Sequence, residues 1–503
     1  MKFGLNLNHH HMLTSRSVIN SVSKLALRYF SSQFKLPELR NFKPATYETW
    51  NLEKIRKVHG KHLNPCLLTI YQNPPILVQG KMQYVWDEKG RQYLDLFGGI
   101  VTTSVGHCHD RLVKALTDQA GKLWHTSSLY VYDEIYRFTD KLLGKFPSQL
   151  NNVFFCNSGS EANEFAILLA RLHTQSYEMI SLRNCYHGCS PNTMALGGIG
   201  TWKYPIPGLP GFHHTTCPDP YQGRFGGSKC RDSLIQTTRD CDCPSGDNCQ
   251  ASDKYIQDLD QVLTTVVPKG RIAGFIVESI LGVGGFVQFP SNYISKAYEK
   301  IKQQGGLFIS DEVQTGFGRT GTHYWGFQAH GIVPDIVTMA KGIGNGFPLA
   351  AVVTSEEIAS SMKKALFFNT FGGNPLACRI GSEVIDIIDD EKMQENSSIQ
   401  GKKLLIGLGK LRDKYPDVIG DVRGKGLMIG IELVKDKETK KPIDPKGFAS
   451  ILEQFKDNGL LIGKGGPSGS VIRITPPMCL SAADVDVTLQ IADHIFSTYR
   501  HVD

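Results

Sequence analysis

Residues 309–321 read I-S-D-E-V-Q-T-G-F-G-R-T-G, and residues 335–351 read D-I-V-T-M-A-K-G-I-G-N-G-F-P-L-A-A. These two segments decide the fold, because in each a short apolar run is followed at once by a charged residue. That residue is Asp311 in the first segment and Lys341 in the second. The runs are rich in apolar and β-branched residues and are bounded by glycine, proline or charge, which is typical of buried strands.

Asp311 and Lys341 are expected to face one ligand. In an open α/β sheet the ligand crevice lies outside the carboxyl ends of the strands, where an acid and an amine can meet. Pyridoxal phosphate (PLP) requires an amine that forms a Schiff base and an acid that keeps the pyridine nitrogen protonated. Taken singly, Asp311 is an ordinary loop cap and Lys341 an ordinary surface lysine, but the pair favours a PLP site.

The same two segments resemble the class III aminotransferases, a branch of the fold-type I PLP enzymes. The resemblance rests on D-E-V-Q-T-G-F-G-R, followed thirty residues after its aspartate by A-K-G. It covers about residues 45–500. It implies an α/β fold with a mostly parallel seven-stranded sheet in a large domain, and a small α+β domain built from both chain ends. Alternating strand and helix signals between residues 107 and 350 favour a doubly wound sheet independently.

Length and composition fit more than one domain. The chain has 503 residues, of which 41% are hydrophobic, and this is too long for one small domain. We expect four segments: a mitochondrial transit peptide at 1–30, an N-terminal arm and meander at 31–106, a large PLP-binding domain at 107–362 that contains a Cys-rich insert at 213–252, and a C-terminal small domain at 363–503.

The N-terminus has the composition of an organellar transit peptide. Its first thirty residues contain four Lys or Arg, several Ser and no Asp or Glu. Arg28 precedes Tyr-Phe-Ser-Ser, which looks like a mitochondrial processing site. We therefore expect a protein of the mitochondrial matrix, and the alternative is a disordered basic tail.

The charge balance argues against nucleic acid as a partner. The formal charge of +7 becomes +3 without residues 1–30, because four positive charges and no negative ones leave. So small a net charge on a chain of this length does not indicate a basic surface that binds nucleic acid. We also expect no membrane partner, because no uninterrupted apolar run is long enough to span a bilayer.

Residues 157–163, N-S-G-S-E-A-N, predict a phosphate site at the start of a helix. Ser158 and Glu161 fit the S-x-x-E capping pattern. A glycine-containing turn at a helix N-terminus offers backbone N–H groups and the positive end of the helix dipole to a phosphate. An ordinary cap is the alternative. The family's phosphate motif implies that Ser158, Gly159 and Ser160 bind phosphate.

The resemblance assigns further residues to the cofactor. Tyr186 would stack on the pyridine ring, and a buried Tyr with a satisfied hydroxyl is the alternative. Glu278 ends a predicted strand at 272–278 and belongs to the same site. Gln314 would hydrogen-bond the phenolic oxygen side of PLP. Thr370 lies in a segment that crosses the dimer interface in class III and contacts the partner's phosphate, which implies a homodimer or a dimer of dimers; a plain Gly-Gly turn is the alternative.

Arg423 is the residue that the resemblance assigns to the substrate carboxylate. The planar fork of Arg gives a carboxylate two parallel charge-assisted hydrogen bonds. Ornithine- and γ-aminobutyrate-type relatives place a glutamate against this arginine, and Val283 stands there in this chain. We therefore expect Arg423 to be free for a small substrate carboxylate in both half-reactions. Ile100 is expected near the substrate, where ornithine-type members carry an aromatic residue.

The insert at 213–252 is predicted to be an excursion on the surface, rich in Gly, Pro, Cys and charge. Cys241-x-Cys243 with Cys249 can hold zinc or form a redox disulfide. The spacing is not that of a standard finger and no His follows, so we assign no metal site. A long Cys-bearing insert also resembles the alanine–glyoxylate group of class III. The remaining cysteines are scattered singly, which favours a reducing compartment.

The expected function is PLP-dependent transamination from a small amino acid such as L-alanine to an oxo acid such as glyoxylate, with ping-pong kinetics. Lys341 would carry PLP and move the substrate proton, and Asp311 would keep the ring nitrogen protonated.

Three alternatives stay open. One is another class III activity on ornithine, γ-aminobutyrate or β-alanine, or a decarboxylase, and Val283 argues against the first two. A nicotinamide-dependent dehydrogenase is suggested by Gly342-Ile-Gly-Asn-Gly346, which lacks the G-x-G-x-x-G spacing. A non-catalytic PLP-fold binding protein is the third, and retention of Asp311, Gln314, Lys341 and Arg423 together argues against it.

Overall fold

The structure is a computed structural model that describes residues 34–39, 42–241, 243 and 249–501. The transit peptide predicted at residues 1–30 lies outside the described residues. None of the helices in the described part is both long and apolar enough to cross a membrane.

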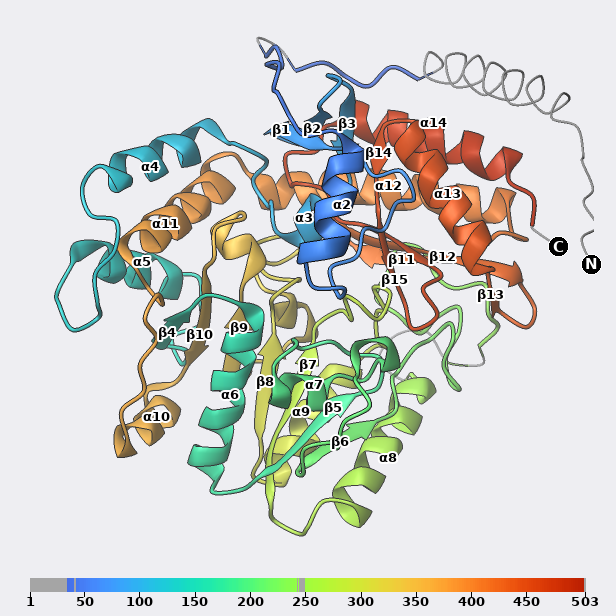
Figure 1. The fold of residues 1–503 in the computed structure, drawn as a ribbon. Coiled ribbons are helices and arrows are strands. Elements are labelled where there is room, and N and C mark those ends of the chain that lie inside the picture. Colours follow the sequence, from blue (N-terminus) through green and yellow to red (C-terminus); the bar gives the residue numbers. More distant parts are fainter. Residues whose placement is uncertain (1–33, 40–41, 242, 244–248, 502–503) are drawn as a thin grey trace, which may run out of the picture.

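A seven-stranded sheet forms the centre of the molecule (Figure 1). Its strand order is β4-β10-β9-β8-β7-β5-β6. β10 runs antiparallel to both of its neighbours, and the other pairs are parallel. The predicted mostly parallel seven-stranded sheet is therefore confirmed. The strands are β4 (Asn152–Cys156), β5 (Glu178–Leu182), β6 (Phe212–Thr215), β7 (Ile272–Glu278), β8 (Leu307–Asp311), β9 (Ile336–Met339) and β10 (Ala350–Thr354).

Helices cover both faces of this sheet, which explains why its central strands are continuous apolar runs. Every residue of β7, β8 and β9 is buried. Ile309 packs in the cluster that holds α6 (Gly159–Thr174), whereas its neighbour Phe308 packs with α9 (Tyr293–Gln303). Successive side chains of a strand point to opposite faces, so α6 and α9 lie on opposite sides of the sheet.

The two ends of the chain together build a second sheet. An antiparallel meander of β1 (Leu77–Lys81), β2 (Tyr84–Asp87) and β3 (Gln92–Asp95) takes its fourth strand from β14 (Leu460–Leu461), which pairs in parallel with β3. Sheet pairing thus joins residues near both termini, as a small domain built from both chain ends requires. The domain boundaries at residues 106 and 362 stay predictions.

A third sheet carries Arg423. Its order is β11-β12-β16-β15, and β13 pairs with β12. The strands are β11 (Ile419–Lys425), β12 (Met428–Asp436), β13 (Lys441–Pro442), β15 (Gly463–Gly465) and β16 (Val471–Ile474).

The remaining elements are short or amphipathic helices around these sheets (Figure 1). The α-helices are α2 (Leu52–His62), α3 (Gly98–Val101), α4 (Asp110–Ala120), α5 (Asp133–Leu143), α7 (Pro191–Leu196), α8 (Gln250–Thr265), α10 (Glu356–Ala359), α11 (Pro375–Asp390), α12 (Met393–Lys414), α13 (Pro445–Asp457) and α14 (Ala482–Thr498). The 3-10 helices are η1 (Gly200–Trp202), η2 (Gly326–His330), η3 (Lys341–Gly344) and η4 (Ser360–Lys364).

The insert at 213–252 is not the surface excursion that its composition predicts. Its first residues, to Thr215, belong to β6, the edge strand of the large sheet. Cys217 and Cys230 are buried, and so is Arg231. The prediction was wrong because polar and cysteine-rich composition does not show that these side chains pack inward.

Candidate active site

Asp311 and Lys341 meet at the carboxyl ends of β8 and β9. β8 ends on Asp311, and η3 begins at Lys341, two residues after β9 ends. Both residues line one cavity of about 140 Å³. Its lining consists of Ser158, Gly159, Ser160, Asn163, Tyr186, His187, Gly188, Glu278, Asp311, Val313, Gln314 and Lys341. Eight of the residues predicted from the sequence are therefore brought together.

The Asp311 carboxylate is held by three donors. Its Oδ2 accepts hydrogen bonds from His187 Nδ1 (2.8 Å) and Asn163 Nδ2 (2.9 Å), and its Oδ1 accepts one from Val313 N (3.1 Å). Burial opposes protonation of His187, but Cys185 and Asp311 raise the pKa of this imidazole overall. These three donors therefore hold the carboxylate in a fixed orientation.

Lys341 combines a strained backbone with a weakened affinity for its proton. Its φ is +51°, a region that side chains rarely adopt and that clusters at functional sites. Burial, followed by the positive charge of Arg473, lowers the pKa of the Lys341 amine to about 8, against the opposing effect of Asp311 and Glu278. A share of this amine is therefore neutral, and so nucleophilic, near neutral pH.

Glu278 lies beside Asp311 in the sheet, because the two residues pair in register across β7 and β8. Its Oε1 accepts a hydrogen bond from Tyr186 N (3.1 Å), and its Oε2 accepts one from Gly282 N (2.8 Å). Burial raises the pKa of Glu278 to about 7, with His187 opposing. Glu278 thus fixes the backbone at Tyr186 and is only partly charged near neutral pH.

The N-terminus of α6 closes one end of the cavity. Ser158 caps the helix by accepting a hydrogen bond from Glu161 N (3.2 Å). Glu161 Oε2 accepts from Asn157 N (2.6 Å) and not from the cap residue, so the predicted capping box is half formed. The first N–H groups of a helix have no intrahelical partner. Those at Gly159 and Ser160 therefore suit an anion.

Three predicted residues, Ile100, Thr370 and Arg423, lie outside this cavity in the single chain. Ile100 is 48% exposed and sits in α3 with a φ of +66°. Thr370 is exposed in the loop that precedes α11. None of the three appears among the residues that line the cavity.

Arg423 is buried and already paired, so the prediction that it stands free is wrong. Its Nη1 forms ion pairs with Asp421 Oδ2 (3.0 Å) and Glu432 Oε2 (2.6 Å), and its Nε donates to Gly285 O (2.8 Å). Two carboxylates of its own sheet supply the counter-charge.

Arg473 was not found from the sequence. Its Nη2 donates to Gln314 Oε1 (2.7 Å), and its guanidinium lies over the rings of Phe286 (4.7 Å) and Phe97 (5.4 Å). Within the described ranges it pairs with no carboxylate, and its buried Nε has no hydrogen-bond partner. Burial lowers the pKa of Arg473 to about 10. The available signal was an Arg inside the apolar run V-I-R-I.

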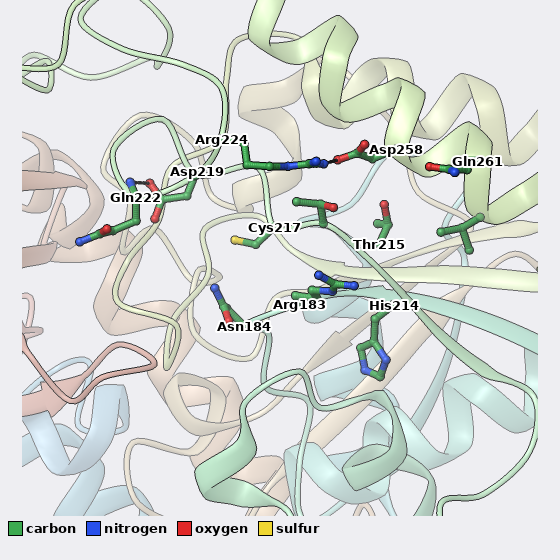
Figure 2. A pocket seen from close by; sticks show the side chains of 13 residues that line it. Arg183, Asn184, His214, Thr215, Cys217, Asp219, Gln222, Arg224, Asp258 and Gln261 are labelled. Atoms are coloured by element: carbon green, nitrogen blue, oxygen red, sulfur yellow. Dashed lines mark hydrogen bonds and ion pairs between the residues drawn. The ribbon is translucent and has the colours of Figure 1, made fainter. Parts of the chain in front are cut away.

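A larger cavity, of about 600 Å³, lies beside β6 and α8 (Figure 2). It is lined by polar groups such as Arg183, His214 and Asp219, and it contains no lysine. The Arg224 guanidinium there is paired with Asp258 (2.6 Å). Without a free amine and an acid facing each other, size alone does not make this cavity the active site.

The cavity at Lys341 has the groups that PLP requires, namely a buried amine of lowered pKa, a fixed carboxylate and a helix N-terminus for a phosphate. The fold and site define a PLP-dependent transferase of fold type I. The family model "Aminotransferase class-III" matches residues 71–496, and the chain belongs to this family.

Known proteins of this family are similar over most of their length. The chain is 46% identical over 486 residues to human "Alanine–glyoxylate aminotransferase 2, mitochondrial", covering 96% of this chain and 93% of that protein. It is 43% identical to the Arabidopsis thaliana "homolog 2" of that name, covering 92% and 91%. An amine transaminase structure from an uncultivated Pseudomonas species, in a PLP-bound form, matches with a TM-score of 0.77 at 27% identity, covering 93% and 100%.

Proposed function

We propose that this class III aminotransferase moves the amino group of a small amino acid such as L-alanine to a small oxo acid such as glyoxylate, with PLP as cofactor. The observation that carries the proposal is the pair of Lys341 and Asp311 in one cavity with a helix N-terminus. The similarity to a protein named for this reaction supports the substrates. PLP, when bound, supplies an electron sink for the substrate α-carbon.

Lys341 and Asp311 would act on different protons, one on the substrate α-carbon and one on the cofactor ring nitrogen. Lys341 Nζ would hold the cofactor, and the same amine would take the substrate α-carbon proton and return it, for which a pKa of about 8 is suited. The Asp311 carboxylate, which His187 and Asn163 keep in place, would hold a proton on the ring nitrogen. Glu278 positions the backbone at Tyr186 and Gly282 by accepting hydrogen bonds from their N–H groups.

The other lining residues bind and orient the cofactor. Ser158, Gly159 and Ser160 offer the phosphate the N-terminus of α6. Tyr186 and Val313 line the cavity and would enclose the ring and exclude water, and Gln314 would hydrogen-bond its phenolic oxygen side.

Two arginines are candidates for the substrate carboxylate. The family resemblance favours Arg423, whose charge is matched in this structure by Asp421 and Glu432. Arg473 lies against Gln314, a residue of the cavity wall, and has no acidic partner in the part of the chain that is described. A substrate carboxylate would supply Arg473 with its missing counter-charge, whereas Arg423 is already paired with two carboxylates. Ile100 would lie at the mouth of the pocket.

Two copies of the chain are proposed to share each site. Apolar side chains gather on two exposed loops, and His125 of one loop contacts Phe371 of the other with ring centroids 5.6 Å apart. An apolar patch of this kind is typical of an interface. A second copy packed on it would bring Thr370 to the partner's phosphate. The exposed residues are Trp124, Leu129, Tyr130, Val131, Leu366, Phe367, Phe368 and Phe371.

A mitochondrial matrix location is supported by the acid-free basic N-terminus and by the names of the relatives. The test is N-terminal sequencing of the protein recovered from the matrix. A new terminus near residue 30 is expected, and an intact Met1 would contradict cleavage.

The activity is tested by the visible spectrum of the purified holoenzyme. The absorbance band of bound PLP should fade on addition of L-alanine and return on addition of glyoxylate. A band indifferent to L-alanine but bleached by ornithine, γ-aminobutyrate or β-alanine would instead place the protein among the other class III activities. A colourless protein that takes up no PLP would overturn the proposal.

A further inference from the structure

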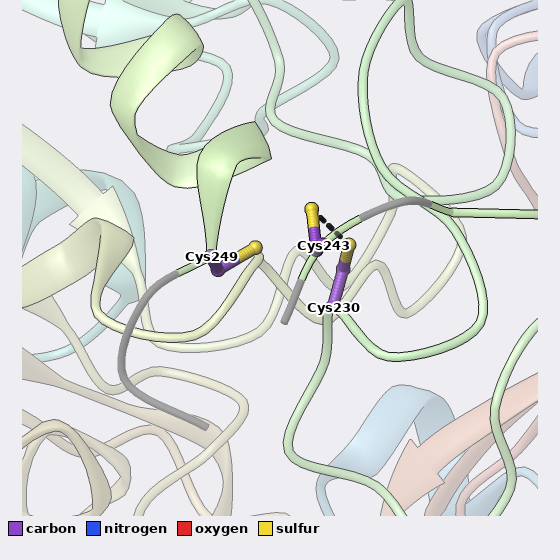
Figure 3. Close-up of side chains that lie close together, drawn as sticks. All are labelled: Cys230, Cys243 and Cys249. Carbon is purple, nitrogen blue, oxygen red and sulfur yellow. Dashed lines mark hydrogen bonds between the residues drawn. The ribbon is translucent and has the colours of Figure 1, made fainter. Parts of the chain in front are cut away.

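Three buried cysteines of the insert lie together, and the sulfur of a fourth, Cys241, lies close to that of Cys230. The sulfurs of Cys230, Cys243 and Cys249 all lie within 4.8 Å of one another, and the three side chains converge from separate stretches of backbone (Figure 3). Cys230 Sγ is 3.7 Å from Cys243 Sγ and 3.2 Å from Cys241 Sγ. Only Cys241 is partly exposed.

We propose that Cys230, Cys241, Cys243 and Cys249 bind one zinc ion as thiolates. In a tetrahedral zinc site with Zn–S bonds of about 2.3 Å, the sulfurs stand about 3.8 Å apart. The Cys230–Cys243 separation of 3.7 Å matches that value and the Cys230–Cys241 separation of 3.2 Å is somewhat shorter, and both exceed the S–S bond length of a disulfide, about 2.05 Å. Cys230 is the ligand that the motif C-x-C-x5-C does not reveal, because it precedes Cys241 by eleven residues.

The position of Cys249 suits an anionic ligand. It is the N-cap residue of α8, and the positive end of this 16-residue helix lies there. Zinc binds thiolates, so binding releases the thiol protons to solvent.

A site with four protein thiolates leaves no open coordination position, so the zinc is structural. It fixes the backbone at Cys230, next to Arg231. The Arg231 guanidinium donates to Asp421 Oδ2 from Nη1 (2.8 Å) and to Asp421 Oδ1 from Nη2 (2.9 Å), and Asp421 in turn holds Arg423. The zinc would therefore lie next to the arginine that holds Asp421, which is the counter-ion of the buried Arg423.

The experiment measures metal content of the full-length protein, as purified and after incubation with zinc chloride followed by desalting. We expect one zinc per subunit in the wild type and in Cys217→Ser, a matched change at a buried cysteine of the same insert. Cys249→Ser should lose the metal. Replacement by cobalt should give the visible absorption bands of a tetrahedral thiolate site.

A second measurement on the wild type does not depend on the folding of any variant. Chelation should make these four cysteines reactive toward a maleimide, mapped by mass spectrometry, while Cys217 stays unreactive. This mapping also separates the site from metal bound to the histidine run at residues 9–11. A wild type without zinc after incubation, or with these cysteines joined in disulfides, would overturn the proposal.

Discussion

Arg423 and Arg473 stand in the same row of one sheet, each paired in register with Gly430 from opposite sides. Residues in one row of a sheet share a face, so both guanidiniums meet the loop at Gly285 and Phe286. Gly430 keeps the space between them open, since a Cβ there would lie 3.0 Å from Gly285 O. Only Arg423 has carboxylate partners in this row, which leaves Arg473 as the uncompensated charge.

Replacement of Arg473 should weaken carboxylate binding. For Arg473→Gln we expect kcat/KM for L-alanine to fall about 10- to 100-fold, since a hydrogen bond to a charged group contributes about 1.5–3 kcal/mol. A simple amine donor without a carboxylate is the internal control and should be affected much less. The measurement is steady-state kinetics with both donors.

The matched variant Arg423→Gln distinguishes the two arginines. If the selective loss with L-alanine occurs there, and Arg473→Gln affects both donors alike, then Arg423 binds the carboxylate and the Arg473 assignment is wrong.

The Lys341→Ala variant should fold but not turn over. Without this amine there is no covalent attachment and no group to carry the α-carbon proton, and proton transfer alone contributes about 10²- to 10⁴-fold. Borohydride treatment followed by peptide mass spectrometry should locate the cofactor on Lys341 in the wild type. Attachment at another lysine would contradict the proposed mechanism.

Asp311→Asn should lower kcat by about 10²-fold or more, because a neutral amide does not hold the proton on the ring nitrogen. Asp260→Asn, which breaks only a surface pair with Lys300 (2.9 Å), is the control and should leave kcat unchanged. Equal rates in the two variants would exclude a role for the Asp311 charge.

The rate of PLP uptake by the apoenzyme should rise with pH through about 8 and then level off, because only the neutral form of Lys341 attacks the cofactor. The positive charge of Arg473 lowers the pKa of this amine, so Arg473→Gln should move the midpoint to higher pH. Stopped-flow absorbance across pH 6–10 measures the pH profiles of the wild type and of Arg473→Gln. Equal midpoints in the two proteins would show that the charges of Arg473 and Lys341 do not interact.

A charge in the exposed apolar patch should break the dimer. Phe371→Asp is expected to give monomers with weak PLP retention, measured by light scattering and by cofactor content after gel filtration. Leu68→Asp, at an exposed apolar residue of a different segment, is the control and should remain dimeric. A monomeric wild type would contradict shared sites and the role of Thr370.

The central strands and the Lys341–Asp311 pair were predictable because each depends on a local pattern, an apolar run that ends at a charge. The pairing of Arg423 with Glu432 was not, because Glu432 reaches it only through the register of β11 with β12. Cys230 was missed for a similar reason, since tertiary packing brings it to Cys243.

The pairing of β14 with β3 bears on how the chain is made. β3 lies near residue 93 and its parallel partner is Leu460–Leu461, so the first sheet lacks its last strand until most of the polypeptide has left the ribosome. Contacts so distant in sequence form slowly. A nascent chain would therefore present an unpaired sheet edge, which is prone to aggregation until β14 has been synthesised.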